Sequence, residues 1–277
     1  MFFRKLKNSS PFREGSLTDR VCVCCCCVDP REHGFFLQHR LSPIENGFFM
    51  SRTNGAFIPK PSPKHDVSMT GLMLVELHKN PLFVFQGHRD CAAVRILFEA
   101  YGKKRSATND SERSFLRSYG DALKLVKENG AHMPQETQLR ILEKICVLQS
   151  VNNLFEHHDM TQQPDYWPVL HAYYALSPLT QEQRLNPEKI ELMIYDPKQG
   201  YFARAEKGNN GIRATDLIDP IGCITLPGND FEITAPIDIE VAVQKEIQIA
   251  ASGMPPRVEQ EDRHGEYQTV TQITYRG

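Results

Sequence analysis

The chain has 277 residues, of which 40% are hydrophobic and 24% charged, and its formal net charge is −2. This is globular composition, and the length allows a large core in one domain or two. The small net charge excludes the basic footprint of a nucleic-acid-binding protein. No apolar run approaches the roughly 20 residues of a membrane-spanning helix, and the basic N-terminus lacks the features of a signal peptide.

Five of the eight cysteines lie in residues 21–28, VCVCCCCV. We expect a buried β-strand here, because free cysteine behaves as a small hydrophobic residue. An alternative is S-acylation, which would attach the chain to a membrane through Cys24, Cys25, Cys26 and Cys27. Metal binding within the run is least favoured, because successive side chains on a strand point to opposite faces. Without a spaced disulfide framework, the cysteines indicate a reducing, cytoplasmic compartment.

Short strands and loops are expected after the cysteine run. Short apolar pieces at residues 34–37, 47–51 and 55–58 indicate short strands, and the proline-rich residues 59–66 indicate an exposed linker or loop. The apolar residues 69–77 could form a hairpin with the strand Leu82 to Phe85.

Apolar spacing predicts helices from Cys91 to Tyr101, over residues 114–129 and over residues 134–155. From Trp167 the pattern changes to strands, at residues 169–176, 190–195 and 201–205 and in β-rich stretches at 212–217, 222–226, 231–235, 237–249 and 267–275. These elements predict an N-terminal cysteine-rich extension over residues 1–66, a catalytic core over 67–212 and a C-terminal β-rich region over 213–277.

Chemistry is expected at Cys91. Asp90 is a good N-cap, which would place Cys91 in the first helical turn, where the helix dipole favours a thiolate. His171 could act as base and acid, Asp196 could orient it, and Gln86 could donate to an oxyanion. The alternatives are that Cys91 is a core thiol, His171 a core histidine, Asp196 a turn residue and Gln86 a loop residue. His88 is a rival base or a residue that lines the cleft.

Three segments resemble papain-like cysteine peptidases: FQGHRDCAAVRILFEAYG at residues 85–102, HAYYAL from His171 and DPKQG from Asp196. They are most similar to the peptidases that cut bacteriocin leaders after a double glycine, and to papain-like effector proteases injected by bacterial pathogens. Ala92 departs from the glycine of the leader peptidases, and the gap from His171 to Asp196 is longer than theirs.

The resemblance implies an α+β, papain-like fold, in which a helical part carries the cysteine and a following antiparallel sheet carries the histidine and aspartate. It also implies a cysteine peptidase with Cys91, His171 and Asp196 as its triad and Gln86 as oxyanion donor, acting on a protein or peptide, with no cofactor and no metal.

Other functions remain open at this stage. The same triad would serve a glutamine deamidase or transglutaminase, and a degenerate papain-like fold would serve a non-enzymatic binding or adaptor protein. A bacterial effector that acts inside a host cell would fit the resemblance. The loop residues His157, His158 and Asp159 could suggest a metal, but adjacent loop histidines are more often solvated. Substrate identity and oligomeric state are not predicted.

Overall fold

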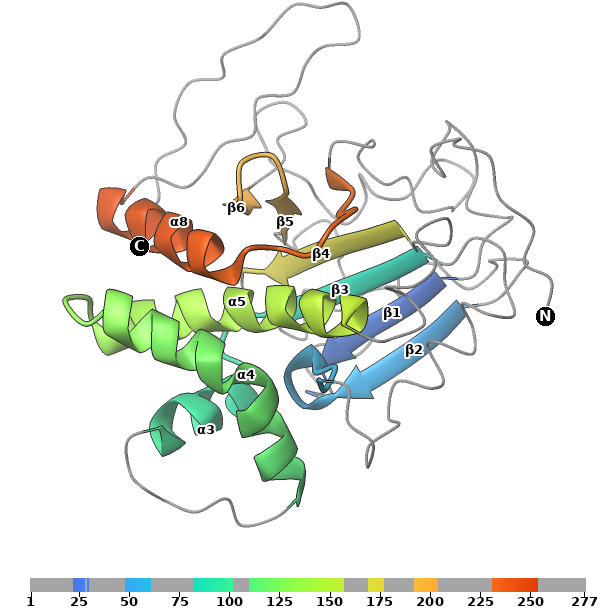
Figure 1. Ribbon diagram of the computed structural model, residues 1–277, viewed down its shortest axis with the longest axis horizontal. Helices are drawn as coiled ribbons and strands as arrows, with labels where there is room; N and C mark the ends of the chain where they lie inside the picture. Colours follow the sequence, from blue (N-terminus) through green and yellow to red (C-terminus); the bar gives the residue numbers. More distant parts are fainter. Residues whose placement is uncertain are drawn as a thin grey trace, which may run out of the picture.

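The computed structural model describes residues 22–27, 29, 48–60, 82–101, 110–156, 169–176, 192–203 and 231–253. These residues form one six-stranded sheet with helices packed against it (Figure 1). None of the described helices is long and apolar enough to cross a membrane.

The sheet is mostly parallel. Its order is β2-β1-β3-β4-β5-β6, in which β1, β2, β3 and β4 run parallel, and β5 and β6 continue the sheet as antiparallel strands. The strands are β1 (Cys22–Cys27), β2 (Phe48–Thr53), β3 (Leu82–His88), β4 (Val169–Ala175), β5 (Leu192–Asp196) and β6 (Tyr201–Ala203).

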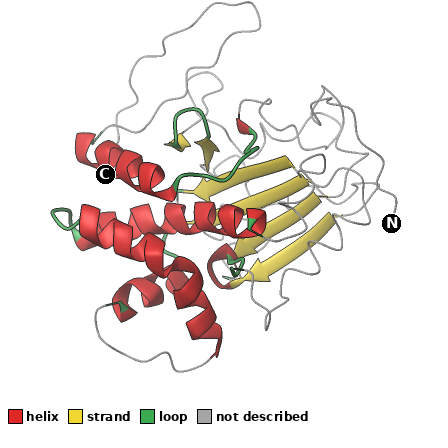
Figure 2. Ribbon diagram, in the orientation of Figure 1, coloured by secondary structure: helices red, strands yellow, loops and turns green. Residues whose placement is uncertain are grey.

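The helices are α3 (Ala92–Ala100), α4 (Asp110–Asn129), α5 (Gln135–Phe155) and α8 (Ile239–Ser252), with a short 3₁₀ turn, η3 (Asn54–Ala56), after β2. Helix α5 crosses the sheet over β3 and β4, and α4 and α8 pack beside it (Figure 2). Because α5 contacts the sheet and its neighbouring helices, 14 of its 21 residues are buried. Helix α5 therefore connects the sheet to the other helices.

The cysteine run forms a central strand, as expected. Parallel strands are covered on both faces and read as continuous apolar runs. The side chains of Cys24, Cys25, Cys26 and Cys27 are all buried, as are Phe83, Val84 and Phe85 on the neighbouring β3. The prediction of a buried strand is thus confirmed, and the strand lies between β2 and β3.

Gly87 allows β3 to lie close against α5. A Cβ atom built at this position would clash with a methyl group of Val147 on α5. Because the glycine has no side chain, the end of β3 approaches the helix directly. His88, the last residue of β3, directly follows Gly87.

The predicted papain-like arrangement is wrong. In place of a helical part followed by an antiparallel sheet, β4 pairs in parallel with β3, which precedes the helices. β1 and β2 belong to the same sheet, so residues 22–27 and 48–53 are structurally continuous with the predicted core. The division of the chain into three domains stays a prediction.

The C-terminal region also differs from the expected strands. Residues 239–252 form α8, whose N-cap Asp238 accepts a hydrogen bond from the Val241 amide. Ala242, Val243 and Glu246 are its buried positions, a helical spacing that the β-rich interpretation overlooked. Residues 231–235 form no strand, and residues 54–56 form η3. The strands expected at 69–77, 212–217, 222–226 and 267–275 lie outside the described residues.

Candidate metal site

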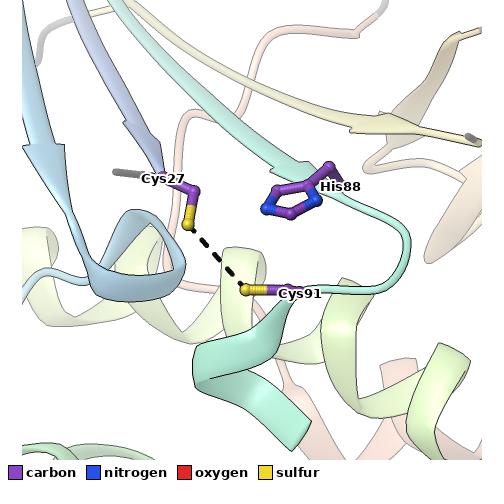
Figure 3. A group of neighbouring side chains, drawn as sticks. All are labelled: Cys27, His88 and Cys91. Carbon is purple, nitrogen blue, oxygen red and sulfur yellow. Dashed lines mark hydrogen bonds between the residues drawn. The ribbon is translucent and has the colours of Figure 1, made fainter. Parts of the chain in front are cut away.

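Three potential metal ligands converge at the carboxyl edge of the parallel strands. Cys27 ends β1, His88 ends β3, and Cys91 is the N-cap of α3. Their ligand atoms all lie within 4.8 Å of one another, in the one such group that the described part of the chain contains (Figure 3). In open α/β sheets, this edge is where ligands bind.

Cys27 sits among hydrogen-bond donors. The amides of Gly55 and Asp29 donate to its Sγ at 3.2 and 3.4 Å. Gly55 has φ +71°, a left-handed conformation that glycine adopts without strain. The Cys91 thiol lies 3.9 Å away, and its hydrogen bond, with a further contribution from His88, lowers the pKa of Cys27. Cys27 is therefore prepared to be a thiolate.

The pKa of Cys91 is shifted in the opposite direction. Its hydrogen bond to Cys27, together with burial, raises its pKa well above the usual range. The expectation of a lowered pKa at this helix start is wrong, because a neighbouring thiolate outweighs the amides of Ala93 and Val94. Asp90 is not the N-cap either, since the helix begins one residue later. A divalent cation would compensate both negative charges and allow both thiols to ionise.

His88 presents one ring nitrogen to the two sulfurs (Figure 3). Its Nδ1 lies 3.0 Å from the carbonyl oxygen of Arg89. Donation from Nδ1 to this carbonyl would fix the tautomer and leave Nε2 as a metal-ligating lone pair. The Asp29 carboxylate lies 4.0 Å from Nε2.

The donor set fits Zn²⁺. Zinc–sulfur bonds of about 2.3 Å at a tetrahedral angle place two sulfurs about 3.8 Å apart, and the observed Sγ–Sγ distance is 3.9 Å. Thiolate and imidazole are the ligands that zinc prefers. Three protein ligands, as against four, are typical of catalytic zinc sites, which keep one position for water or substrate.

A buried carboxylate lies behind the ligands. Glu143 on α5 accepts a hydrogen bond from the Cys91 amide at 3.0 Å and one from the Tyr174 hydroxyl at 2.6 Å. Burial raises the pKa of Glu143, although Tyr174, Arg140 and the Cys91 amide oppose the shift. Arg140 also pairs with Asp90, which precedes Cys91, at 2.6 Å. Helix α5 thus holds the loop that carries His88 and Cys91.

The structure does not assemble the predicted triad. His171 pairs with Val84, which lies four residues before His88 on β3. At about 3.3 Å per residue along a strand, His171 is therefore about 13 Å from the site. Burial also lowers the pKa of His171 to about 3, so it is a poor base. Gln86 is buried within β3, and its neighbour across the sheet is Tyr173.

Asp196 is likewise remote from Cys91. It ends β5, which runs antiparallel to β4, so it lies away from the edge where β3 and β4 end. Its carboxylate accepts hydrogen bonds from the amides of Lys198 and Gln199 at 2.8 and 3.1 Å. Asp196 is a turn residue, which was the alternative interpretation.

The proposed lipid attachment is contradicted by burial. Cys24, Cys25, Cys26 and Cys27 are at most 4% exposed, in a strand that has neighbours on both sides. An acyl transferase could not reach these thiols without removing the strand from the sheet. Cys27, the last residue of this strand, is one of the three candidate metal ligands.

Two ligands were therefore present in the sequence but assigned other roles. In the sequence, Cys27 is one of a run of cysteines and His88 is interpreted as a rival base. The available signal was His-x-x-Cys at residues 88–91 combined with a cysteine at the end of a separate strand. A search within the cysteine run could not find this site, because its residues come from the ends of two different strands and from the start of a helix that meet at the same edge.

Several solved structures are similar to the chain. They include the beta-carbonic anhydrase CcaA, 17% identical over 69% of this chain and 79% of that one, with a TM-score of 0.48. They also include CafD of Aspergillus fumigatus, 14% identical over 64% and 92%, with a TM-score of 0.42. A tetrameric beta-carbonic anhydrase of Sordaria macrospora is 14% identical over 58% and 76%, with a TM-score of 0.38. No curated protein matches.

The family model described as carbonic anhydrase matches residues 22–177, which is more than half of the chain and includes all three ligands. This match overturns the papain-like resemblance, and with it the cysteine peptidase, deamidase and bacterial effector interpretations. The chain belongs to the carbonic anhydrase family.

Proposed function

We propose that this protein is a zinc-dependent carbonic anhydrase, a lyase that interconverts carbon dioxide and bicarbonate. The observation that carries the proposal is the group formed by Cys27, His88 and Cys91, whose ligand atoms lie within 4.8 Å, inside the residues that match the family model. The earlier expectation of no metal and no cofactor gives way to this proposal, because two thiolates and an imidazole form a zinc site.

The three ligands would hold the metal, with His88 oriented by the Arg89 carbonyl. When bound, Zn²⁺ supplies Lewis acidity that brings the pKa of a water molecule close to neutral. Hydration of carbon dioxide adds a water oxygen to carbon and releases one proton. The site must therefore contain a group that accepts this proton and passes it to solvent.

Asp29 is suited to accept the proton. Its carboxylate oxygen lies 4.0 Å from His88 Nε2, and its side chain is 10% exposed, so it touches both the site and solvent. Glu143, the other carboxylate at the ligands, is 1% exposed and is occupied by the Cys91 amide and the Tyr174 hydroxyl. Asp29 is therefore the carboxylate suited to proton transfer, whereas Glu143 is bound to its hydrogen-bond donors.

The experiment combines metal analysis with a rate measurement. The purified protein should contain about one zinc per chain and should accelerate carbon dioxide hydration in a stopped-flow assay with a pH indicator. C27S and C91S should lose both properties. C24A, which changes a buried cysteine three residues from Cys27 on the same strand, should keep both. Wild-type protein that binds zinc without hydrating carbon dioxide would contradict the proposal.

We also propose that the protein self-associates. The support for this proposal is that one of the similar proteins, a beta-carbonic anhydrase of Sordaria macrospora, is described as tetrameric. Sedimentation velocity should then show a species heavier than the 31.6 kDa chain.

A further inference from the structure

His88 ends β3 and Cys91 begins α3, so the segment from His88 to Cys91 contains two of the three candidate ligands. Three contacts attach residues 89–91 to β4 and α5. The Arg89 amide donates to the Ala175 carbonyl of β4 at 2.9 Å. The Asp90 carboxylate pairs with Arg140 of α5 at 2.6 Å. The Cys91 amide donates to Glu143 of α5 at 3.0 Å. Of these, only the last acts on the backbone of a ligand.

Glu143 is itself held in one orientation. Its second oxygen accepts from the Tyr174 hydroxyl at 2.6 Å and lies 3.4 Å from an Arg140 nitrogen. The side chain is 1% exposed, so water does not compete for it. Tyr174 comes from β4 and Glu143 from α5, so the carboxylate is fixed by both the sheet and the helix layer.

We propose that Glu143 is a positioning residue for the metal site. Its hydrogen bond sets the orientation of the Cys91 peptide, and with it the direction in which Sγ leaves the start of α3 toward Cys27 and His88. It does not touch the metal or the substrate. It acts through Cys91, because a ligand whose backbone can rotate would place its sulfur less accurately.

The inference rests on the proposed zinc site, and it predicts opposite behaviour for two conservative variants. E143Q keeps the length of the side chain and an oxygen that can accept from the Cys91 amide. E143D keeps the negative charge but withdraws the carboxylate by one methylene, out of reach of that amide. A role of the charge alone would preserve E143D and impair E143Q.

The measurement is zinc affinity by competition with a chromogenic chelator, together with the absorption spectrum of the Co²⁺-substituted protein. E143Q should bind zinc within about threefold of wild type, and E143D should lose about 10- to 100-fold, the usual cost of removing a group that orients a ligand. The thiolate-to-cobalt absorption band should shift in E143D and stay unchanged in E143Q. E246D is the matched control, because it shortens another buried carboxylate whose partners are the Phe202 amide and Lys144, and it should leave zinc affinity and the cobalt band unchanged.

Melting of the metal-free proteins separates positioning from general stability. If E143D melts like E143Q without metal but binds zinc more weakly, Glu143 acts on the site. Equal zinc affinity in E143D and wild type, or an equal loss in both variants, would overturn the inference. Wild-type protein that fails to bind zinc would instead overturn the proposed function, so the two failures are distinguishable.

Discussion

Individual side chains at this site have roles that follow from where their polar atoms lie. Cys91 stands at a helix start, a position that favours a thiolate in isolation, yet Cys27 at 3.9 Å raises its pKa. A second sulfur at this distance therefore makes Cys91 a candidate metal ligand in place of a candidate nucleophile. Glu143 and Asp29 are both carboxylates beside the ligands, but only Asp29 has access to solvent.

Replacement of Asp29 should slow turnover without releasing the metal. D29N removes the proton acceptor, and general-base groups typically contribute 10²- to 10⁴-fold. We expect kcat for carbon dioxide hydration to fall about 100-fold while zinc content stays the same. Stopped-flow rates and metal analysis on the same preparation test this, with E136Q, a change to an exposed carboxylate on α5, as control. An unchanged kcat in D29N would remove Asp29 from the proton path.

His171 should make the protein sensitive to acid. Burial lowers its pKa in the folded state to about 3, whereas in the unfolded chain it is about 6.5. Between these values the unfolded chain binds a proton that the folded protein excludes, so stability is complete above pH 6.5 and falls as the pH decreases. The contribution to the slope is about 1.4 kcal/mol per pH unit.

H171Q should therefore show a shallower loss of unfolding free energy between pH 6 and pH 4 than wild type, by about that slope. Urea denaturation at a series of pH values gives the two curves, and their difference cancels what both proteins share, metal release included. H132Q, at an exposed histidine, is the control and should reproduce the wild-type slope. Parallel curves for H171Q and wild type would show that His171 is protonated in the folded state.

The elements show which local patterns could be predicted and which could not. The helical spacing of Phe115, Tyr119 and Leu123 predicted α4, and the apolar run at Leu82 predicted β3, because both signals are local. The parallel pairing of β3 with β4 could not be predicted, because the pairing partners Leu82 and Val169 are 87 positions apart and three helices lie between them in the chain. Without knowledge of this pairing, His171 could be interpreted as the base for Cys91, although it lies several residues before the edge of the sheet where Cys91 is found.

The contact between β3 and α5 should depend on Gly87. G87A adds a methyl group that would clash with Val147, and overpacking of this kind typically costs about 1–3 kcal/mol. We expect G87A to lower the unfolding free energy and to weaken zinc binding, since His88 is the next residue. V147A in the same chain should restore part of both losses. Urea denaturation and chelator competition on both single variants and the double variant form the test; purely additive effects would contradict it.

At the scale of the whole molecule, the metal would join residues that are 64 positions apart, Cys27 and Cys91. Zinc at 100 times its Kd should stabilise the folded state by about 2.7 kcal/mol, or about 5 to 10 °C in Tm for a chain of this size. Removal of zinc with a chelator should reverse the shift. Differential scanning calorimetry with stepwise zinc measures it, and C27S should show no shift; a shift as large as that of wild type in C27S would place the metal elsewhere.

The assembled site was the part that sequence could not supply. Cys27, His88 and Cys91 are all visible in the sequence, and two of them were considered for chemistry. Their meaning depends on which strands lie side by side, since β1 ends beside β3 only because the sheet inserts it between β2 and β3. The residue types that could form the site can be read from the sequence, but whether they lie close together depends on how all the strands pair in the sheet.

The central position of β1 has a consequence for where translation can start. The first methionine after Met1 is Met50, within β2. A polypeptide initiated there would lack the strand between β2 and β3, and it would keep only His88 and Cys91 of the three ligands. Such a shortened polypeptide would lack both β1 and one of the three residues proposed to hold zinc, so we expect it to lose the proposed activity.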